Sequence, residues 1–116
     1  SGVFDGSGHE IRNLYMNRDG GCEVALFSYL SDGVIKNLGI TGEIKAKNVN
    51  YVSGILAYGY NNSLIENCYN KANITAEDCR YISGISGTAS RRILYCYNTG
   101  NIVGKSLYDF TLLCAA

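Results

Sequence analysis

A repeated pattern is the feature that most constrains the fold of this chain. The segment LIENCYN at residues 64–70 returns 28 residues later as RILYCYN at residues 92–98, and weaker copies lie at residues 34–40 and 10–16. A second element alternates with the first, and its copies lie at residues 25–29, 51–58, 81–87 and 111–114. Each unit is too short to bury a face alone. Two alternating elements, each present about four times, therefore indicate units that stack on one another.

The local chemistry of the units favours strands over helices. Val, Ile, Tyr, Thr and Asn are frequent, and glycine or asparagine interrupts the apolar runs at short intervals. Residues Ile65, Cys68, Asn70 and Ile74 do not form a helical stripe. The sequence therefore predicts an all-β fold, a parallel β-solenoid of about four coils within one domain, 1–116. The predicted repeats span residues 5–33, 34–63, 64–92 and 93–116.

Known strand geometry sets the size and hand of such a stack. Coils spaced by about 4.8 Å would make a body roughly 20 Å tall. The rule for parallel crossovers favours a right-handed coil. Differences in unit length are expected in the loops at residues 17–23, 45–50 and 76–80.

Aligned residues in the units predict ladders that run along the stack. Glycines 54 and 84 are expected where the coil turns or where two backbones approach closely. Asn70 and Asn98, with Asn67 before the turn, are expected to pass amide hydrogen bonds between coils. Two interior ladders are predicted, one of Ile11, Ile35, Ile65 and Ile93 and one of Leu14, Leu38, Cys68 and Cys96.

Composition excludes several functional classes. The 10 Lys and Arg residues balance the 10 Asp and Glu residues, which argues against a basic nucleic-acid-binding face and a polybasic membrane anchor. A hydrophobic content of 47% is too high for a disordered chain. The apolar runs are too short to span a bilayer, and no secretory signal opens the sequence.

Catalytic and metal-binding patterns are weak. His9 is the sole histidine, so a triad or Cys/His site would have to use it with Asp5, Ser7 or Cys22. No paired C-x₂-C motif predicts zinc. A calcium site at Asp19 and Glu23, or at residues 77–78, competes with a simple solvated loop. We therefore predict no enzyme activity, no cofactor and no metal.

The cysteines are expected to be reduced thiols. An odd count of five leaves at least one thiol outside any internal pair. Cys68 and Cys96 occupy the leucine ladder, where a thiol acts as a small apolar side chain. Stacked parallel residues rarely meet the disulfide dihedral. Cys22 and Cys79 are placed in loops and are predicted to be unpaired.

Tyrosine is the strongest indication of a binding surface. The alignment places Tyr15, Tyr69 and Tyr97 just after the inward ladder position, so their side chains should point outward. Such a column can bind sugar rings or a protein partner, or it can simply stabilise the wall laterally. Arg91 and Arg92 are expected beside this face, where they could assist an anionic ligand.

The opening FDGSGHEIRNL at residues 4–14 resembles a stretch found in bacterial surface β-helix proteins. The elements ALFSY, VIKNLGITG, SGILAY and NCYN, between residues 25 and 70, are similar to GLUG-motif repeats. This family includes adhesin-like proteins and non-catalytic regions of immunoglobulin-A peptidases. The chain departs from it where the family's Gly-Leu-Phe-Gly is Ala-Leu-Phe-Ser, at residues 25–28.

The resemblance implies a bacterial cell-surface or secreted location and a role as stalk, spacer or adhesive surface. The alternative is a carbohydrate-binding or carbohydrate-processing β-helix that uses the tyrosines. The chain starts and stops within repeats, so we expect a fragment of a longer protein. Its predicted partners are flanking repeats of the same polypeptide, a host glycan or protein, or a second copy joined end to end.

Overall fold

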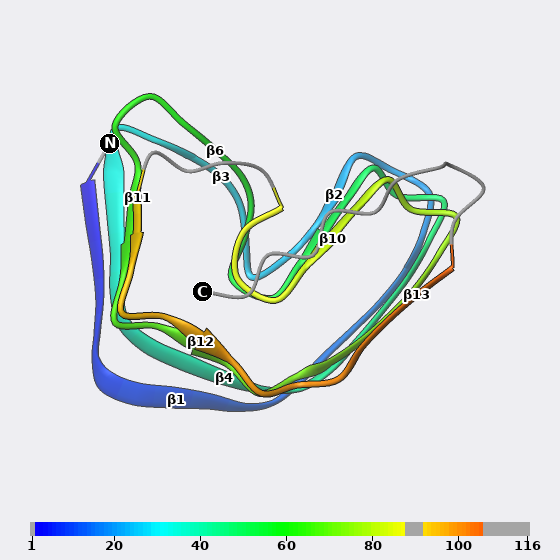
Figure 1. The fold of residues 1–116 in the computed structure, drawn as a ribbon, viewed down its shortest axis with the longest axis horizontal. Helices are drawn as coiled ribbons and strands as arrows, with labels where there is room; N and C mark the ends of the chain where they lie inside the picture. The colour runs from blue at the N-terminus through cyan, green and yellow to red at the C-terminus, as the bar shows by residue number, and fades with distance from the viewer. Residues whose placement is uncertain (1, 88–91, 106–116) are drawn as a thin grey trace.

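The computed structural model describes residues 2–87 and 92–105, and within them every regular element is a β-strand. Figure 1 looks along the stack and shows each coil as a closed outline with a deep bend on one side. The strands are β1 (Gly2–Asp19), β2 (Glu23–Val24), β3 (Phe27–Ser31), β4 (Gly33–Lys47), β5 (Tyr51–Ser53), β6 (Leu56–Tyr60), β7 (Leu64–Glu66), β8 (Tyr69–Asn70), β9 (Asn73–Glu77), β10 (Tyr81–Ser83), β11 (Arg92–Leu94), β12 (Tyr97–Asn98) and β13 (Ile102–Lys105).

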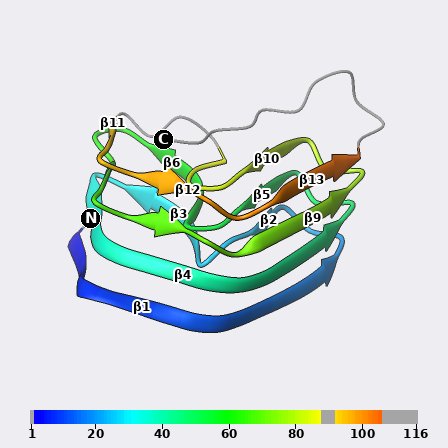
Figure 2. The same cartoon turned by 60° about the horizontal axis from the view of Figure 1, so that its bottom comes forward.

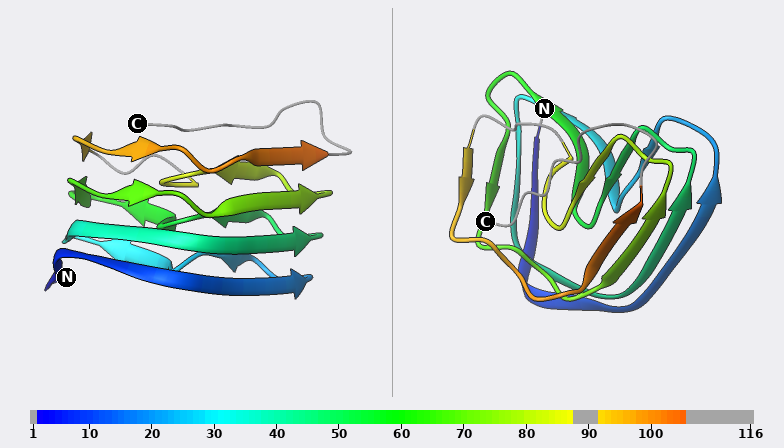
Figure 3. Two further views of the ribbon diagram at one scale, coloured as in Figure 1. Left: turned by 90° about the horizontal axis from the view of Figure 1, so that it is seen from below. Right: turned by 45° about the vertical axis from the view of Figure 1, so that its right-hand side comes forward.

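All of the strand pairs are parallel, which confirms the predicted β-solenoid. Strands β1, β4, β9 and β13 lie one above another in Figure 2, and the left view of Figure 3 shows the same stack from its side. The molecule measures 36 × 29 × 20 Å, and its shortest dimension lies along the stack. The chain makes about three turns, slightly fewer than the four predicted. The copy at residues 111–114 and the end of the fourth repeat lie outside the described residues.

Each coil has an outer wall and a bend that runs back into the coil. Strands β1, β4, β7–β9 and β11–β13 form the outer wall as one eight-stranded sheet. Strands β2, β5 and β10 run inward, and β3 and β6 run outward again (Figure 1). The bend brings apolar side chains from both of its arms against the wall, which gives a single core.

Isoleucine and leucine ladders fill this core. Ile35 pairs with Ile65, and Ile65 pairs with Ile93, as predicted. Ile35 and Ile65 are fully buried, and Ile93 packs against the core from the last described coil. Leu38, Cys68 and Cys96 are buried as well, which confirms that the two thiols replace leucine in the interior.

The predicted alignment of the first unit is wrong. Phe4, not Ile11, pairs with Ile35, while Ile11 pairs with Ile40. Leu14 pairs with Gly42 and does not join the leucine ladder. The reason is two bulges in β1, where residues 6–8 oppose residue 37 alone and residues 12–13 oppose residue 41 alone. Extra residues in one strand shift every later partner.

The unequal unit lengths do not arise in the loops where they were predicted. The corners at residues 20–22, 48–50 and 78–80 have three residues each, so the variable loops predicted near them are not there. The sequence separation between paired residues of adjacent coils falls from 31 at the start of β1 to 28 at its end. It rises to 30 by the pairing of β4 with β7, and the return to 28 occurs between residues 86 and 92.

Glycines at the tip of the bend touch the opposite wall. A Cβ atom on Gly54 would overlap the carbonyl oxygen of Gly84 and lie 2.8 Å from the side-chain Cγ of Asn70. A Cβ atom on Gly84 would meet Asn98 in the same way. The predicted close approach at Gly54 and Gly84 is therefore confirmed, and the atoms that require it are the asparagine amides and, at Gly54, the carbonyl oxygen of Gly84.

Asn70 is fully buried and fully hydrogen bonded. Its Nδ2 donates to the carbonyl of Ala72 at 3.1 Å and to Oδ1 of Asn98 at 2.7 Å. Its Oδ1 accepts from the backbone N–H of Ala72 at 3.1 Å. The predicted amide ladder is thus present, and it holds the wall exactly where the bend contacts it.

We predict that Asn70→Ala lowers the free energy of unfolding by about 2–4 kcal/mol, because it leaves buried backbone groups of Ala72 unpaired and opens a cavity. Urea denaturation measures this change. The matched control is Asn101→Ala, which alters an exposed asparagine and should change stability by less than about 0.5 kcal/mol. Equal effects of the two variants would show that the buried amide has no special role.

Candidate aromatic binding site

Two stacked tyrosines form the predicted aromatic column. Tyr97 pairs with Tyr69 in the parallel ladder, and their ring centroids lie 5.1 Å apart with planes 9° from parallel. Tyr97 is 45% exposed, and Tyr69 is half-buried. The column therefore presents aromatic surface to solvent on the β8–β12 part of the outer wall.

Tyr15 does not belong to this column. The bulges in β1 move it opposite Glu43, while Glu10 takes the place below Gly39 and Tyr69. Tyr15 is 61% exposed on a neighbouring outward ladder. The prediction that Tyr15 aligns with Tyr69 is therefore wrong for the same reason as the alignment of Ile11.

The side chain of Tyr69 extends past Gly39 in the next coil to reach Glu10 in the coil beyond it. It fits because Gly39 lies beneath it, where a Cβ atom would overlap the ring. The Tyr69 hydroxyl donates a hydrogen bond to Glu10, and this bond raises the pKa of Tyr69 to about 12. The same bond lowers the pKa of Glu10, helped by Arg12 at 3.1 Å. The ammonium of Lys71 lies 5.0 Å from the Tyr69 ring centroid, close enough for a cation–π contact.

A depression of about 250 Å³ lies beside the two rings. Polar side chains on its rim form a ladder at the corner, in which Nδ2 of Asn67 donates to Oδ1 of Asn37 at 2.8 Å. The depression combines aromatic surface, amides and an imidazole, which is the mixture found in sites for small polar ligands. Its lining residues are Gly8, His9, Asn37, Leu38, Gly39, Asn67, Tyr69 and Tyr97.

Arg92 is not beside the tyrosines. Arg92 lies on β11, before the corner that leads to β12, and it lines a separate depression with Val34 and Leu64. Arg91 lies outside the described residues. The charged residues that the structure places at the column are Glu10, its ion-pair partner Arg12, and Lys71. The sequence missed Glu10 because its ladder position depends on the bulges.

His9 lines the depression, but its neighbours in sequence serve the fold. Asp5 Oδ1 accepts from the backbone N–H of Ser7 at 2.8 Å and from Nδ2 of Asn37 at 3.0 Å. These bonds lower the pKa of Asp5. Asp19, considered as a calcium ligand, accepts from Asn48 at 3.2 Å. Within residues 2–87 and 92–105, no three His, Cys, Asp or Glu side chains gather as metal ligands would.

All four described cysteines are free thiols. The Cys68 thiol donates to the carbonyl of Glu66 at 3.3 Å, and that of Cys96 donates to Leu94 at 3.2 Å. A hydrogen bond with Cys96, together with burial, raises the pKa of Cys68. Burial also raises the pKa of Cys79, which is buried although it lies in a corner, whereas Cys22 is exposed.

Comparison with family models, with curated proteins and with solved structures gave no match for this chain. Among the described elements, none is a helix with the length and apolar character needed to cross a membrane.

We predict that Glu10→Gln lowers the pKa of Tyr69 from about 12 toward the ordinary value of 10. The loss of the negative acceptor removes the main force that keeps the phenol protonated. The ring carbon signals of ¹³C-labelled tyrosine, followed by NMR from pH 8 to 13, measure the change.

Tyr29 provides the internal control for this titration. Its pKa is raised to about 12 by its hydrogen bond with Tyr60, so it should not respond to Glu10→Gln. Because the pKa of Tyr69 is higher in the folded state than in the unfolded chain, its hydrogen bond stabilises the fold fully below pH 10. This contribution is lost as the pH rises through 12. An unchanged Tyr69 titration in the variant would contradict the hydrogen bond to Glu10.

Proposed function

We propose that this chain is a non-catalytic repeat module of a bacterial cell-surface or secreted protein and acts as a stalk, spacer or adhesive surface. The observation that carries the proposal is the in-register stacking of equivalent residues. Ile44, Ile74 and Ile102 pair in order along the axis. Because each coil contacts only its neighbours, further coils can be added to such a stack with the same contacts between them.

The stack suits a spacer because its length depends only on the number of coils. Each coil adds about 4.8 Å, and hydrogen bonds between coils resist bending of the wall. Flanking repeats of the same polypeptide are the proposed partners at the ends. End-to-end association of two copies is the alternative, because a strand edge without a partner is a template for pairing, and within the described residues β1 pairs with β4 alone.

The resemblance to GLUG-motif repeats supports the proposed location. The chain would then be exposed outside a bacterial cell, where a host glycan or protein could meet its walls. Of the four described thiols, Cys68, Cys79 and Cys96 are buried and so hidden from oxidants, while Cys22 is exposed.

A second candidate function is carbohydrate binding, or carbohydrate processing, at the column of Tyr69 and Tyr97. The depression beside the rings favours it, because sugars present both apolar C–H faces and hydroxyl groups. Asn37 and Asn67 supply amides at its rim, although each is already bonded within the corner ladder.

The location is tested by labelling intact cells of the bacterium that encodes the chain with an antibody raised against it. We expect labelling without permeabilisation, because a stalk or adhesive surface must lie outside the membrane. A cytosolic protein, detected only after permeabilisation, is the control. If the chain is detected only under the same condition as this control, the surface role is wrong.

The adhesive role of the column is tested on a glycan array with Tyr69→Ala plus Tyr97→Ala. We expect any saturable binding at this site to weaken by about tenfold or more, since both ring faces are lost. Tyr15→Ala removes a more exposed tyrosine from a neighbouring ladder and is the control. Binding that persists in the double variant would assign the ligand to another surface.

A further inference from the structure

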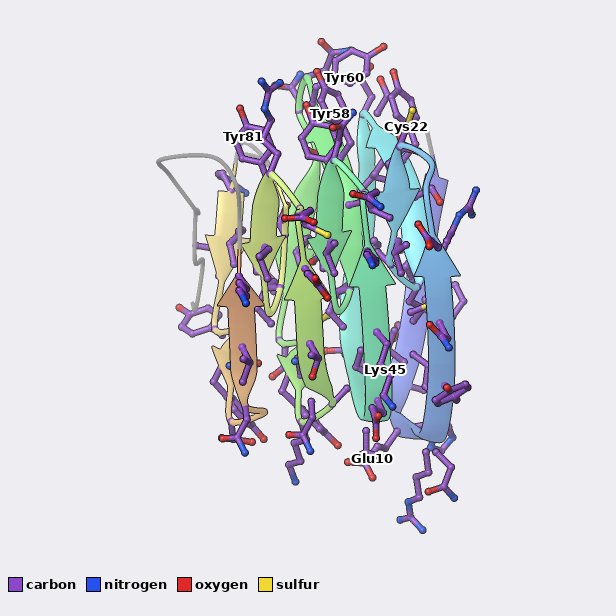
Figure 4. All side chains as sticks on the ribbon, turned by 90° about the vertical axis from the view of Figure 1, so that its right-hand side faces the viewer. Glu10, Cys22, Lys45, Tyr58, Tyr60 and Tyr81 are labelled. Carbon is purple, nitrogen blue, oxygen red and sulfur yellow. The ribbon has the colours of Figure 1, made fainter. Side chains whose placement is uncertain are left out.

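Five tyrosines gather on the outer side of the bend, on a different part of the coil from Tyr69 and Tyr97. We call them the tyrosine cluster: Tyr29, Tyr51, Tyr58, Tyr60 and Tyr81. They come from β3, β5, β6 and β10, which are the two arms of the bend. Figure 4 shows Tyr58, Tyr60 and Tyr81 at one edge of the molecule and Glu10, the partner of Tyr69, at the opposite edge.

The cluster is built from two stacked columns. Tyr51 and Tyr81 lie on the inward arm with ring centroids 5.0 Å apart and planes 8° from parallel. Tyr29 and Tyr58 lie on the outward arm, 5.9 Å apart and 1° from parallel. The ladder pairs both sets in register, so the rings repeat along the stack with the coils.

Edge contacts join the two columns into one surface. Tyr51 meets Tyr58 across the bend at 5.5 Å and 77°, and Tyr60 meets Tyr29 at 5.2 Å and 67°. The interaction with the Tyr60 hydroxyl raises the pKa of Tyr29 to about 12. Because every ring packs against another ring, the side chains are already ordered before a ligand binds. Binding would therefore cost little conformational entropy.

The exposed area decides what kind of ligand fits. Tyr29 is 54% exposed and Tyr60 is 39% exposed, while the other three rings are half-buried. Together they leave roughly 300–500 Å² in solvent, the equivalent of about two tyrosine side chains. This area is smaller than the surface of about 800 Å² that each partner buries in a stable protein complex. It matches the apolar patches of about 300–600 Å² that are often functional on monomers.

The chemistry of the surface selects among small ligands. It combines ring edges and faces with phenolic hydroxyls, and the charges that act on Tyr51, from Arg80 and Glu23, have opposite signs. A neutral ligand with both apolar C–H surface and hydroxyl groups suits such a surface best. Sugar rings have this character, and an extended sugar chain repeats at a spacing close to that of the stacked rings.

We propose that the tyrosine cluster binds a neutral, extended oligosaccharide that runs along the solenoid axis. The site is separate from the column of Tyr69 and Tyr97 and goes beyond the proposed role as a repeat module. The role as a repeat module depends on the stacking of the coils, whereas ligand binding depends on the five tyrosine rings. The two proposals can therefore fail independently.

The first test uses the wild-type chain with hexasaccharides of β-1,4-linked glucose and of β-1,4-linked N-acetylglucosamine. A hexasaccharide of galacturonic acid is the charged comparison. We expect saturable binding of at least one neutral probe by calorimetry, with little binding of the charged one. In NMR spectra of ring-labelled protein, the signals of Tyr29, Tyr58 and Tyr60 should shift, and those of Tyr69 and Tyr97 should not.

Two outcomes of this first test overturn the proposal. One is that neither neutral hexasaccharide binds. The other is that one binds to saturation while the ring signals of the tyrosine cluster stay in place. Shifts confined to Tyr69 and Tyr97 would assign the ligand to the first column and would leave the repeat-module proposal intact.

The second test compares single variants with matched exposure. Tyr60→Ala should weaken binding of the neutral probe by about tenfold, because it removes a ring that contacts two others. Tyr97→Ala removes a ring of similar exposure from the other site and should change affinity less than about twofold. Thermal unfolding of both variants checks the fold, and equal losses of affinity would overturn the proposal.

Discussion

The contact between the tip of the bend and the opposite wall is the constraint on which the rest of the structure depends. Gly54 and Gly84 have no side chains at the points where the amides of Asn70 and Asn98 press against the backbone. The polar atoms of Asn70 bond within the wall, to the backbone of Ala72, so the contact with the bend is one of close packing. The same tip joins β5 to β6, whose tyrosines Tyr51 and Tyr58 meet across the bend.

Much of the fold could be predicted because stacking makes equivalent residues neighbours. The 28- and 30-residue spacings place Ile35, Ile65 and Ile93 in one ladder without any knowledge of the coil shape. The first coil could not be aligned this way, since its apparent motif match ignored two bulges. Both bulges contain positive φ values, at Ser7 and Gly8 in the first and at Asn13 in the second, and such residues also occur in ordinary turns, so they do not by themselves indicate a bulge.

The candidate sites, like the fold, could be predicted from the sequence only in part. Tyr69 and Tyr97 could be paired because they occupy the same place in adjacent units, and the structure keeps them stacked. Their partner Glu10 depends on the bulges, and Arg92 lies on another stretch of wall. The tyrosine cluster was not predictable from one repeat element. Tyr51 and Tyr58 meet because the chain reverses direction between them, at Gly54, where the backbone packs against Asn70 of the opposite wall.

The buried amide of Asn70 packs directly against Gly54 at the tip of the bend. NMR of the labelled chain tests this contact directly, through the nuclear Overhauser effect between the side-chain amide protons of Asn70 and the α protons of Gly54. The account predicts a strong effect, and slow exchange of the Asn70 amide protons with solvent. No such effect, with Asn70 protons that exchange as fast as those of the exposed Asn101, would contradict it.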